Sequence, residues 1–418
     1  ILRTPLFKAT SLNSISVLMK IATGLITSKV LAIFVGPSGM ALAGNLKNFM
    51  TSVESIATLG FQNGIVKYVV EHKDNETEFK KIISTVFISL LTVSLLLSGI
   101  LFGFSSYFTQ SVLDNSAQYT IVFKVLALVL PWYATTAFLN LVLNGLGKYR
   151  SVIYINIIGN IVGLLFAVAA IWYFKTLGAL LSIIIPPALL FFVVFYYINK
   201  DFPFFATISR HAFDFQVIKN MSSYSLMALV STVFGSLVFL AIRKHIIAVL
   251  GIEQAGYWEA ITRISNYYLL FISTMLTVYF FPKLAFSKSK KATKNVFWSY
   301  YYGILPLFVL GLIVLFFLRF FVIQLFFTKA FMPVSELFFW QLLGDVFKAA
   351  SLILGYQFFA RKLTIAFIAT EIFSLLMMYT FCHFFITAFG IQGVVMAHAL
   401  TYFIYWIILV IYFRKSLF

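Results

Sequence analysis

Acidic residues are scarce in this sequence: 13 Asp and Glu stand against 31 Lys and Arg, giving a formal net charge of +18. Charged residues together make up 11% of the chain, less than half of the roughly 25% typical of soluble domains. Hydrophobic residues make up 61%, and they form long unbroken runs. We therefore predict an all-α polytopic membrane protein, because a membrane β-barrel would show alternating apolar segments instead.

Chemical motifs are also lacking. Cys382 is the one cysteine, which excludes a disulfide framework and a cysteine metal site. No HExxH, paired-carboxylate or Walker A motif is present. We therefore expect the protein not to be an enzyme and not to bind a metal or cofactor. We also expect that it does not use ATP as its energy source. The basic residues do not form a soluble basic domain, which argues against a nucleic-acid partner.

Apolar stretches of about 20 residues indicate membrane-spanning helices, and they predict about twelve spans. The expected spans are 10–35, 41–67, 82–108, 119–146, 151–174, 178–199, 217–242, 252–281, 295–318, 335–360, 364–387 and 392–413.

Most Lys and Arg outside these spans fall on the side that carries both chain ends. The other side has Lys175, Arg243, Lys244, Arg319 and Lys329. By the positive-inside rule, both termini are predicted to be cytoplasmic.

The two halves of the chain repeat weakly. “LVLNGLGKYRSVI” from residue 141 matches “LILGYQFFARKLT” from residue 352, and “TLGALLSIII” from residue 176 resembles “IQGVVMAHAL” from residue 391. We predict an N-terminal lobe of six helices over 1–200, a cytoplasmic linker over 201–216 and a C-terminal lobe of six helices over 217–418. Lobes in the same orientation predict a cavity between them near the membrane midplane.

Several charges lie inside the predicted spans, where each costs about 2.5–3.5 kcal/mol on insertion scales. Lys20, Arg263 and Lys348 are too deep to reach the headgroups, and Lys47 is shallower. One interpretation is intrahelical neutralisation by local pairs: Asp345 with Lys348, Glu259 with Arg263, and Lys47 with Glu54. The other is a cationic cavity lining for an anionic cargo.

The remaining polar residues leave similar alternatives open. Near the outer ends of the spans, Lys29, Lys124, Arg243 and Lys244 are equally well explained as interfacial anchors. The candidate ion or proton sites are Glu54, Asp345 and Glu371. The candidates for contacts with sugar hydroxyls are four amides: Asn140, Asn144, Asn156 and Asn160. Helix–helix hydrogen bonding explains each of them equally well.

Segments along nearly the whole chain resemble one known family. They include “LMKIATGLITSKVLAIFVGPSGMALAGNL”, “FQNGIVKYV”, “VYFFPKL” and “LFFWQLLGDVFK”. The chain resembles the Wzx-type oligosaccharide-lipid flippases, in particular the lipid III flippases of enterobacterial common antigen assembly, in the multidrug/oligosaccharidyl-lipid/polysaccharide exporter superfamily.

The resemblance implies a MATE-like, V-shaped pair of six-helix lobes. It also implies a cargo of undecaprenyl-pyrophosphate-linked oligosaccharide, of O-antigen or enterobacterial common antigen type, moved from the cytoplasmic to the periplasmic leaflet by alternating access. The family's cavity cations would fall on Lys20, Lys29, Lys47 and Lys348, with Asp345 as the accompanying acid.

On this hypothesis the partners are the lipid-linked glycan, the bilayer and the polymerase and chain-length proteins of the same pathway. We expect a monomer, with coupling to H⁺ or Na⁺ and to the membrane potential. Two alternatives remain open. A cation-coupled multidrug exporter predicts an acidic cavity, and a membrane glycan polymerase or ligase predicts positioned acids, bases or metal ligands.

Overall fold

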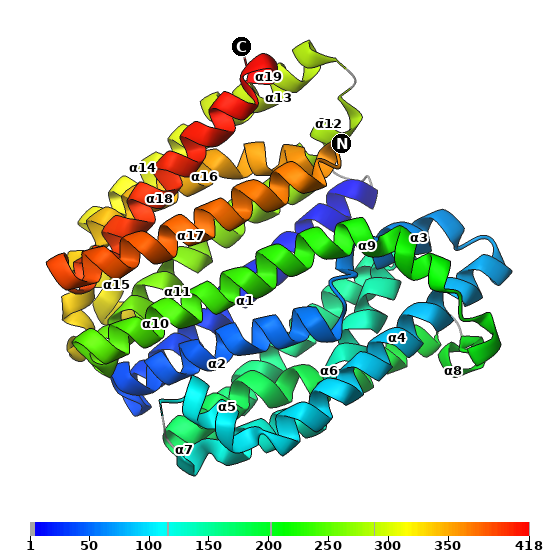
Figure 1. The fold of residues 1–418 in the computed structure, drawn as a ribbon, viewed down its shortest axis with the longest axis horizontal. Coiled ribbons are helices and arrows are strands. Elements are labelled where there is room, and N and C mark those ends of the chain that lie inside the picture. Colours follow the sequence, from blue (N-terminus) through cyan, green and yellow to red (C-terminus); the bar gives the residue numbers. More distant parts are fainter. Residues whose placement is uncertain (1–4, 115–116, 201–202, 288, 418) are drawn as a thin grey trace. The chain divides into compact units, whose positions relative to one another are not determined.

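The computed structural model describes residues 5–114, 117–200, 203–287 and 289–417. Every regular element in these ranges is a helix, and long helices run side by side in bundles (Figure 1). The predicted all-α class is therefore confirmed. Residues 201 and 202 of the predicted linker lie outside the described residues.

The first half of the chain contains helices α1 to α8 and two short 3₁₀ turns. Their bounds are α1 Pro5–Phe34, α2 Gly36–Ala57, α3 Gln62–His72, α4 Glu76–Gly103, α5 Ser105–Val112, η1 Ala117–Tyr119, α6 Thr120–Gly145, α7 Tyr149–Asn199, α8 Phe204–Thr207 and η2 Arg210–Ala212.

The second half contains helices α9 to α19, with two π-helical segments and one 3₁₀ segment among them. Their bounds are α9 Phe215–Leu229, η3 Val230–Phe234, α10 Gly235–Leu250, α11 Ile252–Met275, η4 Leu276–Phe280, α12 Phe281–Phe286, α13 Lys290–Gly303, α14 Leu305–Phe317, α15 Arg319–Phe326, η5 Lys329–Leu337, α16 Phe338–Ala360, α17 Thr364–Phe389, α18 Ile391–Tyr412 and α19 Arg414–Leu417.

Side-chain caps fix the starts of three helices. The side chains of Asn75, Asp214 and Ser289 accept hydrogen bonds from backbone N–H groups in the first turns of α4, α9 and α13. Each cap satisfies a donor that has no partner within its helix. All three lie in connections that sequence analysis assigned to the cytoplasmic side.

Ten helices in the described part of the chain are long and apolar enough to cross a membrane. One of them, Tyr149–Asn199, covers two predicted spans. The expectation of one helix over 41–67 is wrong, because Leu59 and Gly60 adopt positive φ and separate α2 from α3. The protein is thus a polytopic membrane protein, and a count of twelve crossings stays a prediction.

The break predicted between 151–174 and 178–199 lies at Lys175, whose φ of 50° and ψ of −123° interrupt α7. Gly390 repeats this turn between α17 and α18, with φ 59° and ψ −141°. In both places a glycine follows three residues later, Gly178 or Gly393, where a Cβ would lie 1.9 or 2.1 Å from a backbone oxygen. Close approach of the backbones therefore requires glycine in both halves.

Two further turns recur at the same spacing of 215 residues. Gly36 and Gly251 both have positive φ, as do Gly147 and Lys362. The internal repeat is therefore present in the backbone. The sequence match from residue 141 aligns Gly147 with Phe358. The turns instead align Gly147 with Lys362, four residues later.

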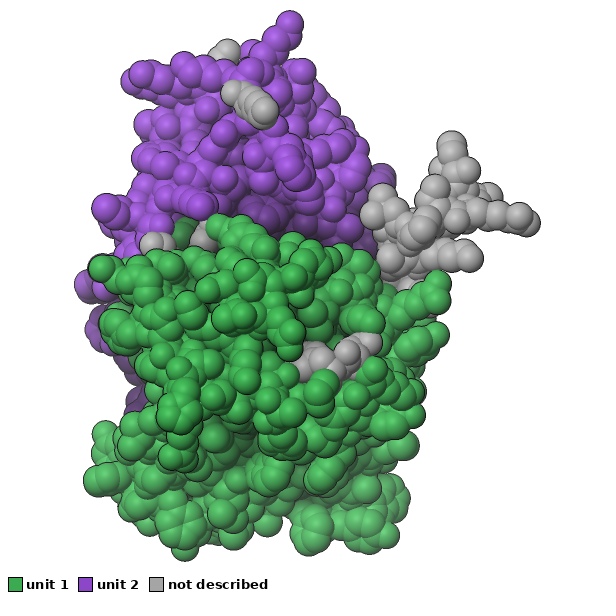
Figure 2. All heavy atoms as spheres, turned by 90° about the vertical axis from the view of Figure 1, so that its right-hand side faces the viewer, with its two compact units in different colours: residues 1–35, 42–240 green, residues 36–41, 241–418 purple. Residues whose placement is uncertain are grey.

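The chain forms two compact units, coloured separately in Figure 2. Unit 1 contains residues 1–35 and 42–240, and unit 2 contains 36–41 and 241–418. Both α2 and α10 are shared between units. The division into lobes of 1–200 and 217–418 stays a prediction.

Within unit 1, the linker docks on α4. The Ser84 hydroxyl donates to the Thr207 carbonyl and accepts from the Ser209 N–H, and the Thr85 hydroxyl accepts from the Asp214 N–H. Phe204 is buried against α4 and α6.

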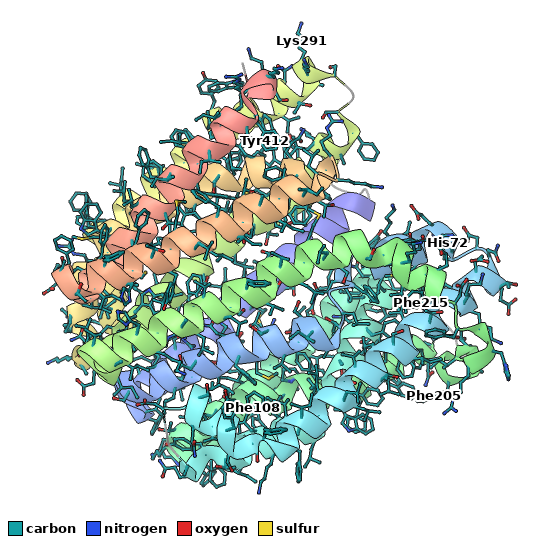
Figure 3. The ribbon with its side chains drawn as sticks, in the orientation of Figure 1. His72, Phe108, Phe205, Phe215, Lys291 and Tyr412 are labelled. Carbon is teal, nitrogen blue, oxygen red and sulfur yellow. The ribbon has the colours of Figure 1, made fainter. Side chains whose placement is uncertain are left out.

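The ends of the helices follow the predicted sidedness within each unit. In unit 1, the exposed Phe205 and Phe215 lie at the same end as His72, and Phe108 lies toward the other end (Figure 3). In unit 2, Lys291 and Tyr412 lie at one end (Figure 3). These groupings agree with the connections that the charge pattern placed together on one side.

Candidate functional site

The most enclosed charged group in unit 2 is the Asp345 carboxylate on α16, whose residue is fully buried. Its Oδ2 accepts hydrogen bonds from the Ser265 hydroxyl at 2.6 Å, the Tyr268 hydroxyl at 2.5 Å and the Gln341 amide at 3.2 Å. Its Oδ1 lies 3.0 Å from His398 Nε2. Four donors from three helices therefore replace the water that burial removes.

Local sequence explains how these groups meet. Gln341, Asp345 and Lys348 lie at i, i+4 and i+7 along α16, so they share a face. A Cβ on Gly344 would lie 2.3 Å from His398 Cδ2 and 3.0 Å from backbone atoms of Ala399. Glycine at 344 thus lets α18 approach α16 closely enough for His398 to reach the carboxylate.

Lys348 lies beside this site without contacting the Asp345 carboxylate directly. Its Nζ is 5.1 Å from the centre of the Tyr402 ring, and it hydrogen-bonds to the Tyr402 hydroxyl. Asp345 and Glu371 are near enough to attract it. The predicted attraction between Asp345 and Lys348 is present, but the basic group in contact with the carboxylate is the His398 ring.

A second charged group joins α10 to α11. Glu259 accepts from Arg243 at 2.6 Å and from Arg263 at 2.8 Å. The predicted Glu259–Arg263 pair is confirmed. The interfacial-anchor interpretation of Arg243 is wrong, since this residue is 1% exposed and lies over the Trp258 ring.

This triad of Arg243, Glu259 and Arg263 carries two positive charges and one negative charge. Arg243 is enclosed, whereas the Arg263 side chain keeps 11% of its surface exposed. The group therefore carries one excess positive charge, and Arg263 is its less buried cation.

In unit 1, Glu54 on α2 is half-buried. It accepts a hydrogen bond from the Tyr133 hydroxyl on α6 and attracts Lys20 on α1. Sequence analysis found no partner for Lys20 because α1 itself offers none. The Lys20 side chain is exposed.

The other predicted cations differ in exposure. Lys47 is exposed and Lys29 is half-buried, and both have partners within the structure. Lys124 and Lys244 are exposed, as the anchor interpretation expects.

The four predicted amides are not equivalent. Asn144 and Asn156 are exposed, and Asn140 and Asn160 are half-buried. The Oδ1 atom of Asn140 is buried without a hydrogen-bond partner within the protein.

Sequence reasoning missed the groups that reach these charges from other helices, which are Tyr133, Ser265, Tyr268 and His398, and it missed the contact of Arg243 with Glu259. These contacts join different helices, so no local spacing marks them. Gln341 was also missed, although it lies four residues before Asp345 on the same helix. No group of three or more metal-ligating side chains occurs in the described part of the chain.

Comparison with known proteins gives relatives that match nearly end to end. The chain is 27% identical over 401 residues to the lipid III flippases of Escherichia coli (strain K12) and Shigella flexneri, which covers 96% of this chain and 96% of each relative. The resemblance predicted from sequence motifs is confirmed by these matches.

Solved structures with very different sequences share the fold. An inward-facing MATE family transporter of the MOP superfamily aligns with a TM-score of 0.80 at 14% identity, over 96% of this chain and 94% of that chain. The lipid II flippase MurJ, in an inward closed conformation, aligns with a TM-score of 0.74 at 16% identity, over 97% of this chain and 87% of that chain.

The family described as “Polysaccharide biosynthesis protein” matches residues 6–288, well over half of the chain. The protein therefore belongs to the polysaccharide biosynthesis protein family, and its fold is that of the MOP superfamily.

Proposed function

We propose that the protein is a flippase that moves an undecaprenyl-pyrophosphate-linked oligosaccharide from the cytoplasmic to the periplasmic leaflet of a bacterial inner membrane. End-to-end similarity to lipid III flippases supports the lipid-linked glycan as cargo. The observation that carries the proposal is the Arg243–Glu259–Arg263 triad, because it presents a surplus guanidinium at membrane depth.

The triad suits a diphosphate for electrostatic reasons. Arg243 offsets the charge of Glu259, so Arg263 retains a net positive charge for an external anion. Guanidinium groups bind phosphate oxygens through two parallel hydrogen bonds. Without such a partner, a diphosphate in hydrocarbon would lose its hydration with nothing in return.

Lys20 supplies the corresponding cation in unit 1, where the half-buried Glu54 positions it. Asn140 offers an acceptor for a glycan hydroxyl. We propose that the headgroup crosses by alternating access of two six-helix lobes. An inside-negative potential favours outward movement of the anion by about 2.3 kcal/mol per charge per 100 mV.

Asp345 and Glu54 are poor candidates for a site that binds a cationic drug. Asp345 is fully enclosed by protein donors, and Glu54 is engaged by Tyr133 and Lys20. A cationic drug would therefore compete with groups already in place. We propose that the protein is a transporter rather than a glycan polymerase or ligase. We also propose that it acts as a monomer, and that the separate polymerase and chain-length proteins of the same pathway are its partners.

The test is flipping of an undecaprenyl-pyrophosphate-linked oligosaccharide in proteoliposomes by the wild type and Arg263→Gln. We expect the initial rate to fall by about tenfold to a hundredfold, since a charge-assisted hydrogen bond contributes about 1.5–3 kcal/mol. Arg150→Gln removes an exposed arginine outside the triad and should leave the rate unchanged. Equal rates for all three proteins would contradict the proposed role of Arg263.

A further inference from the structure

Exposed cations gather at the end of unit 2 where α12, α13 and α19 lie (Figure 1). Residues 260–335, 346–370 and 372–418 contain no Asp or Glu, and these ranges hold the segments that meet at this end. No acid therefore lies beside the cations in sequence. We call this surface the basic end and define it by six exposed residues: Lys290, Lys291, Arg361, Lys362, Arg414 and Lys415.

Contacts between helices bring these cations onto one surface. Arg361, which follows α16, donates a hydrogen bond to Ser287 between α12 and α13. The Trp298 indole on α13 donates to the Leu417 carbonyl on α19 at 2.9 Å. These contacts join residues 74 and 119 positions apart. The basic end is therefore one packed region rather than a set of separate loops.

Arg361 is held in place through one nitrogen of its guanidinium. Its Nη2 donates to the Ser287 carbonyl at 2.6 Å and lies 3.2 and 3.3 Å from the hydroxyls of Ser287 and Thr293. Both of these residues are buried. The Nε and Nη1 atoms make no hydrogen bond to the residues that the structure describes. An exposed guanidinium that is anchored through one nitrogen and keeps donors for a further acceptor suits a phosphate group.

Large apolar side chains are exposed beside these cations. Ile365 is 86% exposed and Phe286 is 83% exposed, the two highest fractions among the large hydrophobic residues that the structure describes. Phe286 directly precedes Ser287, and Ile365 lies four residues after Arg361. Cations next to exposed apolar groups match the boundary between lipid headgroups and acyl chains. A soluble anion would leave the apolar groups in water.

The end of unit 1 that carries the turn between α3 and α4 shows what the positive-inside rule alone requires. Four acids stand among its lysines within residues 71–78, and ion pairs join Lys67 to Glu71 and Lys81 to Glu78. Acids contribute little to that rule, so it accounts for the lysines of both units. It does not account for the lack of acids, the anchored arginine or the exposed apolar side chains at the basic end.

We propose that the basic end binds anionic phospholipids of the surrounding bilayer, with Arg361 holding a headgroup phosphate and with Phe286 and Ile365 reaching the acyl chains. Six cations need several anionic headgroups for charge balance, which phospholipids supply and a single diphosphate cargo does not. The basic end shares no residue with the triad on α10 and α11. Phospholipid binding there does not depend on the proposed flippase function.

The experiment titrates the detergent-purified protein with phosphatidylglycerol and, separately, with neutral phosphatidylcholine, and native mass spectrometry counts the bound lipids. We expect the wild type to bind phosphatidylglycerol more tightly than phosphatidylcholine. Lys291→Gln should weaken the binding of phosphatidylglycerol about fivefold, the effect of one lysine at an anionic surface. Arg361→Gln should weaken it about tenfold or more, because a charge-assisted hydrogen bond is lost as well.

Three further variants make the test specific. Lys73→Gln is the matched control, because Lys73 is an exposed lysine beside the acids of unit 1, and it should bind phosphatidylglycerol as the wild type does. Arg361→Lys keeps the charge without the planar fork, so its affinity should fall between those of the wild type and Arg361→Gln. Ile365→Ser removes an apolar contact and should weaken the binding of phosphatidylglycerol without any change in charge.

Three results would overturn the proposal. One is an equal loss of affinity in Lys73→Gln and Lys291→Gln, because general positive charge would then explain the binding. Another is phosphatidylcholine bound as tightly as phosphatidylglycerol. The third is undecaprenyl phosphate bound more tightly than phosphatidylglycerol and lost in the same variants, which would make the basic end a cargo site. Flipping rates play no part in this test, so its failure and that of the proposed function are distinguishable.

Discussion

Replacing Asp345 by alanine removes the partner of four polar groups: the buried Ser265, Gln341 and His398 and the half-buried Tyr268. An unsatisfied buried donor costs about 1–3 kcal/mol. Breaking a buried charged pair by deleting one partner costs roughly 3–5 kcal/mol. Because the hydroxyls can rotate and a water can enter the space, we expect the total for Asp345→Ala to fall at about 3–5 kcal/mol rather than at the sum over four donors.

Asparagine at the same position should cost far less. Its oxygen replaces Oδ2, and its amide can donate to His398 Nε2, so we expect a loss of about 1 kcal/mol. The assay is thermal melting of detergent-purified protein, with Asp74→Ala as the control for loss of an exposed aspartate. The expected order of melting temperatures is wild type and Asp74→Ala, then Asp345→Asn, then Asp345→Ala. Equal melting temperatures for Asp345→Asn and Asp345→Ala would refute the view that hydrogen bonds to the carboxylate stabilise unit 2.

Three further changes test other contacts. Gly344→Ala adds a Cβ that would lie 2.3 Å from His398 Cδ2, so it should displace His398 and lower the melting temperature of the detergent-purified protein. An unchanged melting temperature would contradict the close approach of α16 and α18. Gly256→Ala places a Cβ 2.1 Å from the Pro37 carbonyl oxygen and should lower the free energy of unfolding by about 1–3 kcal/mol. Thermal melting measures this loss, and an unchanged melting temperature would show that the contact tolerates a side chain. Ser84→Ala removes the hydroxyl that holds the linker through Thr207 and Ser209, so limited proteolysis should cut residues 203–214 faster than in the wild type.

Contacts within one helix could be predicted from the sequence. Glu259 and Arg263 are four residues apart on α11, and helical geometry alone brings them together. The helical class and the break near Lys175 followed in the same way, from apolar run length and local composition. Such predictions succeed because they involve one segment at a time.

Contacts between helices could not be predicted in this way. Asp345 and His398 are 53 residues apart, and their meeting depends on Gly344 allowing α16 and α18 to approach. Because Lys348 lies closer to Asp345 in sequence, its attraction to the carboxylate could be predicted, whereas the contact with His398 could not. Arg243 similarly resembled an interfacial anchor until α11 placed Glu259 beside it.

The internal repeat was predicted correctly in one respect and wrongly in another. Its existence was readable from the sequence, but its register near residue 141 was not, because a gapless match of apolar letters tolerates a shift of about one helical turn. The turns at Gly147 and Lys362 fix the register through backbone conformation. Positive φ at a lysine is not a property that the sequence displays.

The account's central claim is that this chain moves an anionic lipid-linked glycan across a membrane. The most direct measurement is the rate at which an undecaprenyl-pyrophosphate-linked oligosaccharide, placed on one leaflet, becomes accessible on the other in liposomes with and without the protein. Fast transfer that requires the protein, and that undecaprenol-based lipids lacking the diphosphate do not show, is the result we predict. Transfer no faster than in empty liposomes, together with protein-dependent movement of cationic drugs, would contradict the claim.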